Sequence, residues 1–158
     1  MVIQLLKAAW LPGLIGSILF TGFLLIHHFY GPGPNTRDEN GKRKFPKEFR
    51  TFVAVEFTGL IVMMLSLATF SVSQFQNAVP EAGAIMQISA AYVVLWIINL
   101  WDLIVIDWVL VVRFRPKQIV LPDTPYFTTM KPHVFGWFGG NVYIVPFAVV
   151  AYSLTQLF

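Results

Sequence analysis

The sequence contains no cysteine. This absence excludes structural disulfides, thiolate-bound metal and a thiol–disulfide redox site. Charged residues are also scarce, at 12% of the chain, whereas soluble domains carry about 25%. Because 56% of the residues are hydrophobic, too few polar side chains remain to cover a water-soluble core. The composition therefore indicates an integral membrane protein.

Several functional motifs are missing as well. The chain has no phosphate-binding glycine loop, no G-x-S-x-G nucleophile motif and no fixed H-E-x-x-H or E-x-x-H metal spacing. The ten-residue alternation of a transmembrane β-strand is also absent, so helices and not a barrel are expected. A b-type haem needs two histidines that face each other across a bundle. The three histidines all fall near one predicted end of the helices, which argues against haem.

Four apolar segments are long enough to cross a hydrocarbon layer of about 30 Å. They cover about residues 8–30, 50–75, 82–113 and 136–157. These lengths leave no room for a separate soluble domain. We therefore expect an all-α membrane protein in which residues 1–158 form a single four-transmembrane-helix bundle.

The basic residues predict the topology. Of the eleven Lys and Arg residues, all except Lys7 lie in or beside the two long, proline-containing connections, and the short connection at 74–83 has none. The positive-inside rule then places both long loops in the cytoplasm and both termini on the extracytoplasmic side, in a bacterial-type inner or plasma membrane. The net charge of +3 is explained by topology and lipid contact, so no nucleic-acid partner is expected. The residues assigned to lipid headgroups or topology are Arg37, Lys42, Arg43, Lys44, Lys47, Arg50, Arg113, Arg115 and Lys117.

The third apolar segment carries polar residues where lipid would normally be expected. Asn99, Asp102 and Asp107 all fall inside its apolar run. A carboxylate at the centre of a spanning helix costs about 2.5–3.5 kcal/mol on insertion scales. The other helices must therefore compensate these carboxylates, and any function is expected where they do so.

Depth estimates bring the acidic residues together. With Arg50 and Arg113 as boundaries, Glu56 and Asp107 each lie about 9 Å inside the membrane and Asp102 about 16 Å inside, at about 1.5 Å per residue. These residues fall toward the same side of the membrane. Glu56, Asn99, Asp102 and Asp107 are therefore predicted to form one polar site near the cytoplasmic leaflet.

The histidines are predicted at the same level. His27 and His28 end the first span, and His133 is expected just before the fourth. Imidazole and carboxylate together suit zinc, manganese or iron, and they can also relay protons. His27, His28 and His133 are therefore the candidate ligands if a divalent metal is the cofactor.

Angular positions constrain the third helix. At about 100° per residue, Asn99 and Asp102 lie about 60° apart, whereas Asp102 and Asp107 lie about 140° apart. The two aspartates should then not share a narrow face. We expect this helix to contact protein on two sides, as the inner helix of a bundle or a dimer interface would.

Three functional hypotheses remain open at this stage. The first is a carboxylate–histidine site that binds a cation or metal or relays protons. The second is a structural or accessory subunit, as a homo-oligomer or within a larger membrane complex, whose polar residues only fix helix packing. The third is an intramembrane enzyme that uses Asp102 or Asp107 for acid–base chemistry on a lipidic substrate.

Overall fold

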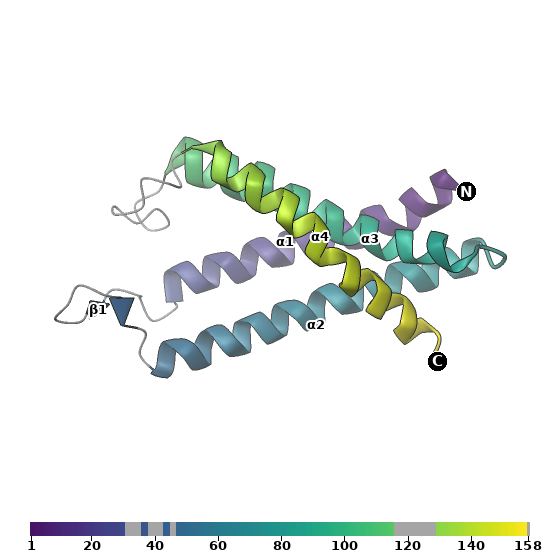
Figure 1. The fold of residues 1–158 in the computed structure, drawn as a ribbon, viewed down its shortest axis with the longest axis horizontal. Helices are drawn as coiled ribbons and strands as arrows, with labels where there is room; N and C mark the ends of the chain where they lie inside the picture. The colour runs from purple at the N-terminus through teal and green to yellow at the C-terminus, as the bar shows by residue number, and fades with distance from the viewer. Residues whose placement is uncertain (31–35, 38–42, 45–46, 116–128, 158) are drawn as a thin grey trace.

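Four long helices make up the fold, as predicted (Figure 1). A computed structural model describes the backbone of residues 1–30, 36–37, 43–44, 47–115 and 129–157, and the side chains of 1–26, 50–115 and 129–157. Each of the four helices is long and apolar enough to span a membrane. The helices are α1 (Val2–Tyr30), α2 (Lys47–Ala78), α3 (Ala84–Trp101) continued by the π-helix η1 (Asp102–Phe114), and α4 (Met130–Thr155).

Between α1 and α2, two short strands pair antiparallel. Strand β1 (Thr36–Arg37) lies beside β2 (Arg43–Lys44), with Thr36 opposite Lys44. This pair lies outside the helical bundle (Figure 1). The all-helical character of the spanning region is therefore unaffected.

The observed helix ends differ from the predicted spans, most of all in α4. We expected the fourth helix to start at about residue 136, after Pro132, but it starts at Met130. Pro132 is only its third residue, where the missing backbone N–H is not needed for an intrahelical hydrogen bond. The prediction that His133 precedes the fourth helix is therefore wrong, because His133 lies in its first turns.

Helix α3 is the inner helix of the bundle. It contacts α1, α2 and α4, whereas no contact joins α1 to α4 within the described ranges. On one side its Ala91 and Leu95 pack with Ala68 of α2 and Ala148 of α4, all fully buried. The expectation that the third helix faces protein on more than one side is confirmed.

Small residues bring α1 close to α3. The α carbon of Gly13 lies so near Ile97 that an added β carbon would come within 2.9 Å of the Ile97 β carbon. Farther along α1, the Trp101 indole Nε1 donates a hydrogen bond to the Thr21 hydroxyl at 3.1 Å. Close packing and interhelical hydrogen bonds are the main attractive forces between helices in lipid, where the hydrophobic effect does not favour helix contact.

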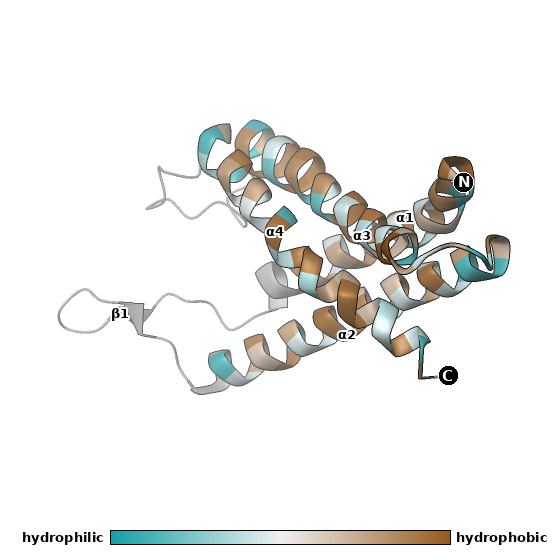
Figure 2. Ribbon diagram, turned by 45° about the vertical axis from the view of Figure 1, so that its right-hand side comes forward, coloured by the Kyte–Doolittle hydropathy of each residue, from teal (hydrophilic) through white to brown (hydrophobic). Residues whose placement is uncertain are grey.

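The long connections and the chain termini lie at opposite ends of the bundle. The C-terminal ends of α1 and η1 and the N-terminal ends of α2 and α4 lie at one end, and both termini lie at the other (Figure 1). Hydrophobic residues predominate along the helices (Figure 2), and many large hydrophobic side chains are exposed on the outside of the bundle. This arrangement fits four crossings, with both long connections on one side of a membrane.

A first prediction concerns this topology. Thr129 and Asn77 are both exposed and lie at opposite ends of the bundle. In the native cysteine-free chain, Thr129→Cys should react with a membrane-impermeant maleimide only from the cytoplasmic side, because the basic connections direct that end inward. Asn77→Cys should react only from the outside. Reaction of both variants from the same side would contradict four crossings.

A second prediction tests the α1–α3 contact. Gly13→Ala should destabilise the bundle by about 1–3 kcal/mol, since the added methyl group overpacks against Ile97. Gly22→Ala in the same helix is the matched control, because nothing lies within 4 Å of its added β carbon. It should be neutral or stabilise by up to about 1 kcal/mol through higher helix propensity. Unfolding titrations in mixed micelles measure both, and equal stability of the two variants would argue against the close contact.

Candidate functional site

The backbone changes register at Asp102, the first of the two aspartates. Helix α3 is α-helical up to Trp101, and η1 continues as a π-helix from Asp102 to Phe114. Its end shows the wider turn directly: the Arg115 N–H donates to the Leu110 carbonyl five residues earlier, at 2.9 Å, with Arg115 in the left-handed region at φ 49°. The π-helix is rare in proteins and occurs often at functional sites.

This change of register corrects the angular prediction. A π-helix has more residues per turn than an α-helix, so residues five apart lie more nearly on one face. Asp102 and Asp107 are five apart, and Asp102 lies within electrostatic range of both Asp107 and His133. The expectation that the two aspartates point in clearly different directions is therefore wrong. The local helix type brings them closer to one side of the helix, where Asp107 contacts His133.

The most direct polar contact between helices joins η1 to α4. His133 Nδ1 lies 2.8 Å from Asp107 Oδ1. The His133 side chain is 7% exposed and that of Asp107 is 22% exposed. The distance is that of a hydrogen bond in which Nδ1–H donates to the carboxylate. His133 thus compensates the aspartate nearest the C-terminal end of η1, where the helix dipole disfavours negative charge.

Asn99 extends the polar contact toward the middle of the bundle. Its Nδ2 donates to the Trp137 carbonyl of α4 at 3.3 Å, and Asn141 Nδ2 donates to the same carbonyl at 2.8 Å. The Asn99 side chain lies directly over Gly140, where an added β carbon would come within 2.9 Å of Asn99 Oδ1. Only glycine at this position allows the amide to reach the backbone of α4.

These residues lie along the side of α4 and the side of α3 and η1 that contact each other, and we call them the polar seam. On α3 and η1 it consists of Asn99, Asp102 and Asp107. On α4 it consists of His133, Trp137, Gly140 and Asn141, whose spacing of three or four residues places them on one helix face. Trp137 Nε1 and Asn141 Oδ1 are buried and have no hydrogen-bond partner among the described residues. The seam therefore retains hydrogen-bonding capacity beyond its protein–protein contacts.

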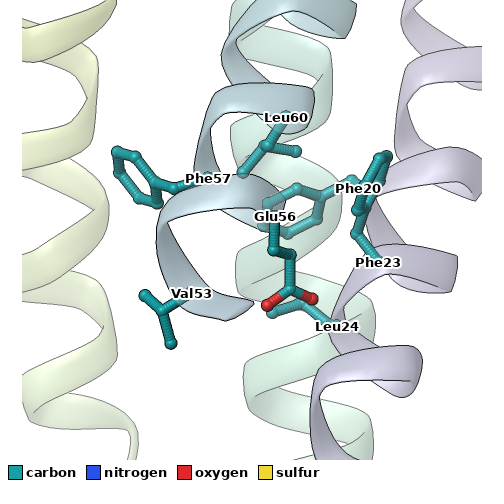
Figure 3. A pocket seen from close by; sticks show the side chains of 7 residues that line it. All are labelled: Phe20, Phe23, Leu24, Val53, Glu56, Phe57 and Leu60. Atoms are coloured by element: carbon teal, nitrogen blue, oxygen red, sulfur yellow. The ribbon is translucent and has the colours of Figure 1, made fainter. Parts of the chain in front are cut away.

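Glu56 lies elsewhere. It lines a pocket between α1 and α2, where its carboxylate faces apolar side chains (Figure 3). In the described part of the chain, α2 makes no contact with η1. Of the four predicted polar-site residues, the structure thus brings together Asn99, Asp102 and Asp107, and it assigns Glu56 to a separate location.

The predicted metal ligands are only partly described. The backbone of His27 and His28 lies in the last turn of α1, but their side chains fall outside the described residues. No three His, Asp or Glu side chains within the described ranges are grouped as a metal site requires. Ligation by His27 and His28 therefore stays a prediction.

The basic residues assigned to lipid headgroups lie at the expected end. Arg50, Arg113 and Arg115 are exposed there. Lys47 begins α2, and Arg37, Arg43 and Lys44 belong to the strand pair. Lys42 and Lys117 lie outside the described residues. Their contact with lipid is not tested by the fold and stays a prediction.

The sequence analysis missed the part of the seam that α4 provides. With α4 starting after His133, no periodic relation between His133 and Gly140 was visible. Had the helix been extended back through Pro132, the spacing His133–Trp137–Gly140–Asn141 would have indicated a single polar face.

A third prediction tests the Asn99–Gly140 contact. Gly140→Ala should destabilise the protein by about 1–3 kcal/mol because the methyl group collides with the Asn99 amide. Gly139→Ala is the matched control, since nothing lies within 4 Å of its added β carbon. In the double variant Asn99→Ala, Gly140→Ala the collision is removed, so the two changes should cost less together than separately. If the losses of unfolding free energy in the two single variants add up to the loss in the double variant, measured in mixed micelles, this contact is contradicted.

Comparison with known proteins gives no match: no family model, no curated protein and no solved structure is similar to this chain.

Proposed function

We propose that this small polytopic membrane protein takes up and relays protons at Asp107 and His133, with Asp102 as the next carboxylate toward the membrane interior. The observation that carries the proposal is the contact of 2.8 Å between His133 Nδ1 and Asp107 Oδ1, formed between two apolar, membrane-spanning helices. Ionisable residues in such positions are rare, and chains of acidic residues and histidine are typical of proton pathways.

The chemistry of the pair suits a proton. With Nδ1–H donating to the Asp107 carboxylate, the second imidazole nitrogen, Nε2, is the atom that can accept another proton. Protonation there changes the pair from net negative to neutral, which reduces the cost of charge in a low-dielectric environment. Transfer of the Nδ1 proton to Asp107 then leaves the net charge unchanged. The pair can therefore exchange protons without creating an isolated buried charge.

Asp102 gives the proton a second acceptor. It lies within electrostatic range of Asp107 and His133 and is deeper in the span. The buried Trp137 Nε1 and Asn141 Oδ1 add one donor and one acceptor along the same seam. A sequence of polar groups at increasing depth is what a proton relay requires, whereas helix packing alone would be served by the Asn99 contact.

A fourth prediction follows. In liposomes with a trapped pH-sensitive dye and a potassium diffusion potential, the purified protein should conduct protons. Asp107→Asn keeps the shape and a hydrogen-bonding group but cannot carry the proton. It should lower the rate by about 100-fold, a typical effect of removing a proton-transferring side chain. Asp102→Asn should also lower the rate.

The control is Glu81→Gln, which changes an exposed carboxylate at the opposite end of the bundle and should leave the rate unchanged. Wild-type flux equal to that of protein-free liposomes would overturn the proposal, as would an Asp107→Asn variant that conducts like wild type. If Asp107→Asn then only lowers the unfolding temperature, the seam serves only to stabilise helix packing. Flux that depends on a sodium or potassium gradient would assign it to a metal cation instead.

A further inference from the structure

The second half of the third span has an unusual backbone. Helix η1 stays π-helical over 13 residues, from Asp102 to Phe114, whereas π-helices occur mostly as single turns inside α-helices. The first half, α3, is an ordinary α-helix of 18 residues. Because the π form is rare, a chain segment is expected to adopt the α form unless a contact selects the wider register. The structure around η1 must therefore supply such a contact.

The sequence of η1 does not itself require the wide register. It contains no proline, glycine or serine, the residues that commonly interrupt or bend an α-helix. Its mostly apolar composition resembles that of α3, which is α-helical. The difference between the two halves of the span thus lies in what each half packs against.

Helix η1 is packed more loosely than α3. In the described part of the chain, α3 contacts α1, α2 and α4, whereas η1 contacts only α4 and α1 among the other three spans. Five residues of α3 are buried. In η1, all of whose residues the structure describes, Ile106 is the one buried residue. Little apolar packing therefore resists a change of helix type in η1.

One polar contact fixes how η1 is turned about its axis. Asp107 Oδ1 lies 2.8 Å from His133 Nδ1 of α4. The preceding end of the span is held separately, since Trp101 Nε1 donates to the Thr21 hydroxyl of α1 at 3.1 Å. With that end fixed, the helix type decides the direction of Asp107. In the α form Asp107 would lie about 140° around the axis from Asp102, away from its present direction.

We propose that η1 is a register switch. It is π-helical while Asp107 contacts His133, and it returns to the α form when this contact is lost, which turns Asp107 away from α4. The switch itself does not depend on proton transfer. Its consequence for function rests on the proposed function: in the α form Asp107 is out of reach of His133, so the register change ends proton exchange between them.

Cysteine scanning with spin labels measures the register directly, because the native chain has no cysteine. Each residue from 103 to 114 except Asp107 is labelled in turn in lipid nanodiscs, and its accessibility to oxygen is recorded by electron paramagnetic resonance. Accessibility repeats about every 3.6 residues along an α-helix and over a longer period along a π-helix. The otherwise native protein should show the longer period.

Two variants remove the contact. Asp107→Leu deletes the carboxylate and should shorten the period in η1 to about 3.6 residues. His133→Leu removes the other partner and should do the same, which decides the matter if Asp107→Leu does not fold. The matched control is Gly136→Ala, one turn further along α4, where nothing lies within 4 Å of the added β carbon. It should keep the longer period.

Proton flux, recorded on the same proteins, separates the switch from the proposed function. A period of about 3.6 residues in the otherwise native η1 would overturn the switch, as would a longer period that persists in Asp107→Leu. If that variant keeps the longer period and only loses flux, the proposed function stands without the switch. If the period shortens although the native protein conducts no protons, the switch stands and the proposed function fails.

Discussion

The packing of α4 against η1 depends on one contact between a partly buried carboxylate and an imidazole. Within lipid there is no water to hydrate Asp107, and the apolar faces of α4 and η1 gain little from contact with each other compared with contact with acyl chains. The 2.8 Å contact with His133 stabilises the packing of α4 against η1. Loss of either partner would leave a charge or a donor in a poorly hydrated site.

Two local features adapt the backbone to this contact. The π-helical register of η1 brings Asp102 and Asp107 closer to one side of the helix, and Gly140 lets Asn99 reach the carbonyl of Trp137. Both features place polar groups against protein and not against lipid. The apolar outer surface of the bundle is a consequence of this arrangement, since polar residues of the third span are directed toward α4.

The sequence alone was sufficient for the four spans, the inner third helix and the importance of its polar residues, because length and hydropathy determine them. It was not sufficient for the π-helix, whose register depends on tertiary contacts that a 100° periodicity ignores. It also placed the start of α4 too late, because Pro132 was interpreted as lying before the helix. The sequence also could not show which glycines allow close contact between helices, because that depends on tertiary packing. Gly13 and Gly140 make close contacts, whereas Gly22, Gly136 and Gly139 do not. The membrane depth estimated from the sequence is the same for Glu56 as for Asp107. Glu56 nevertheless lies apart from the seam, because α2 faces α1 at that level.

His133 and Asp107 are proposed to form one proton-exchanging unit inside the membrane. Nitrogen NMR of isotope-labelled histidine tests it most directly, in a His27→Gln, His28→Gln background that leaves His133 as the only histidine. We predict that Nδ1 is protonated and hydrogen-bonded, that Nε2 gains and loses a proton as pH changes, and that Asp107→Asn shifts the Nδ1 signal. An Nδ1 signal that is identical with and without Asp107, in an imidazole that does not respond to pH, would show that His133 and Asp107 do not form such a unit.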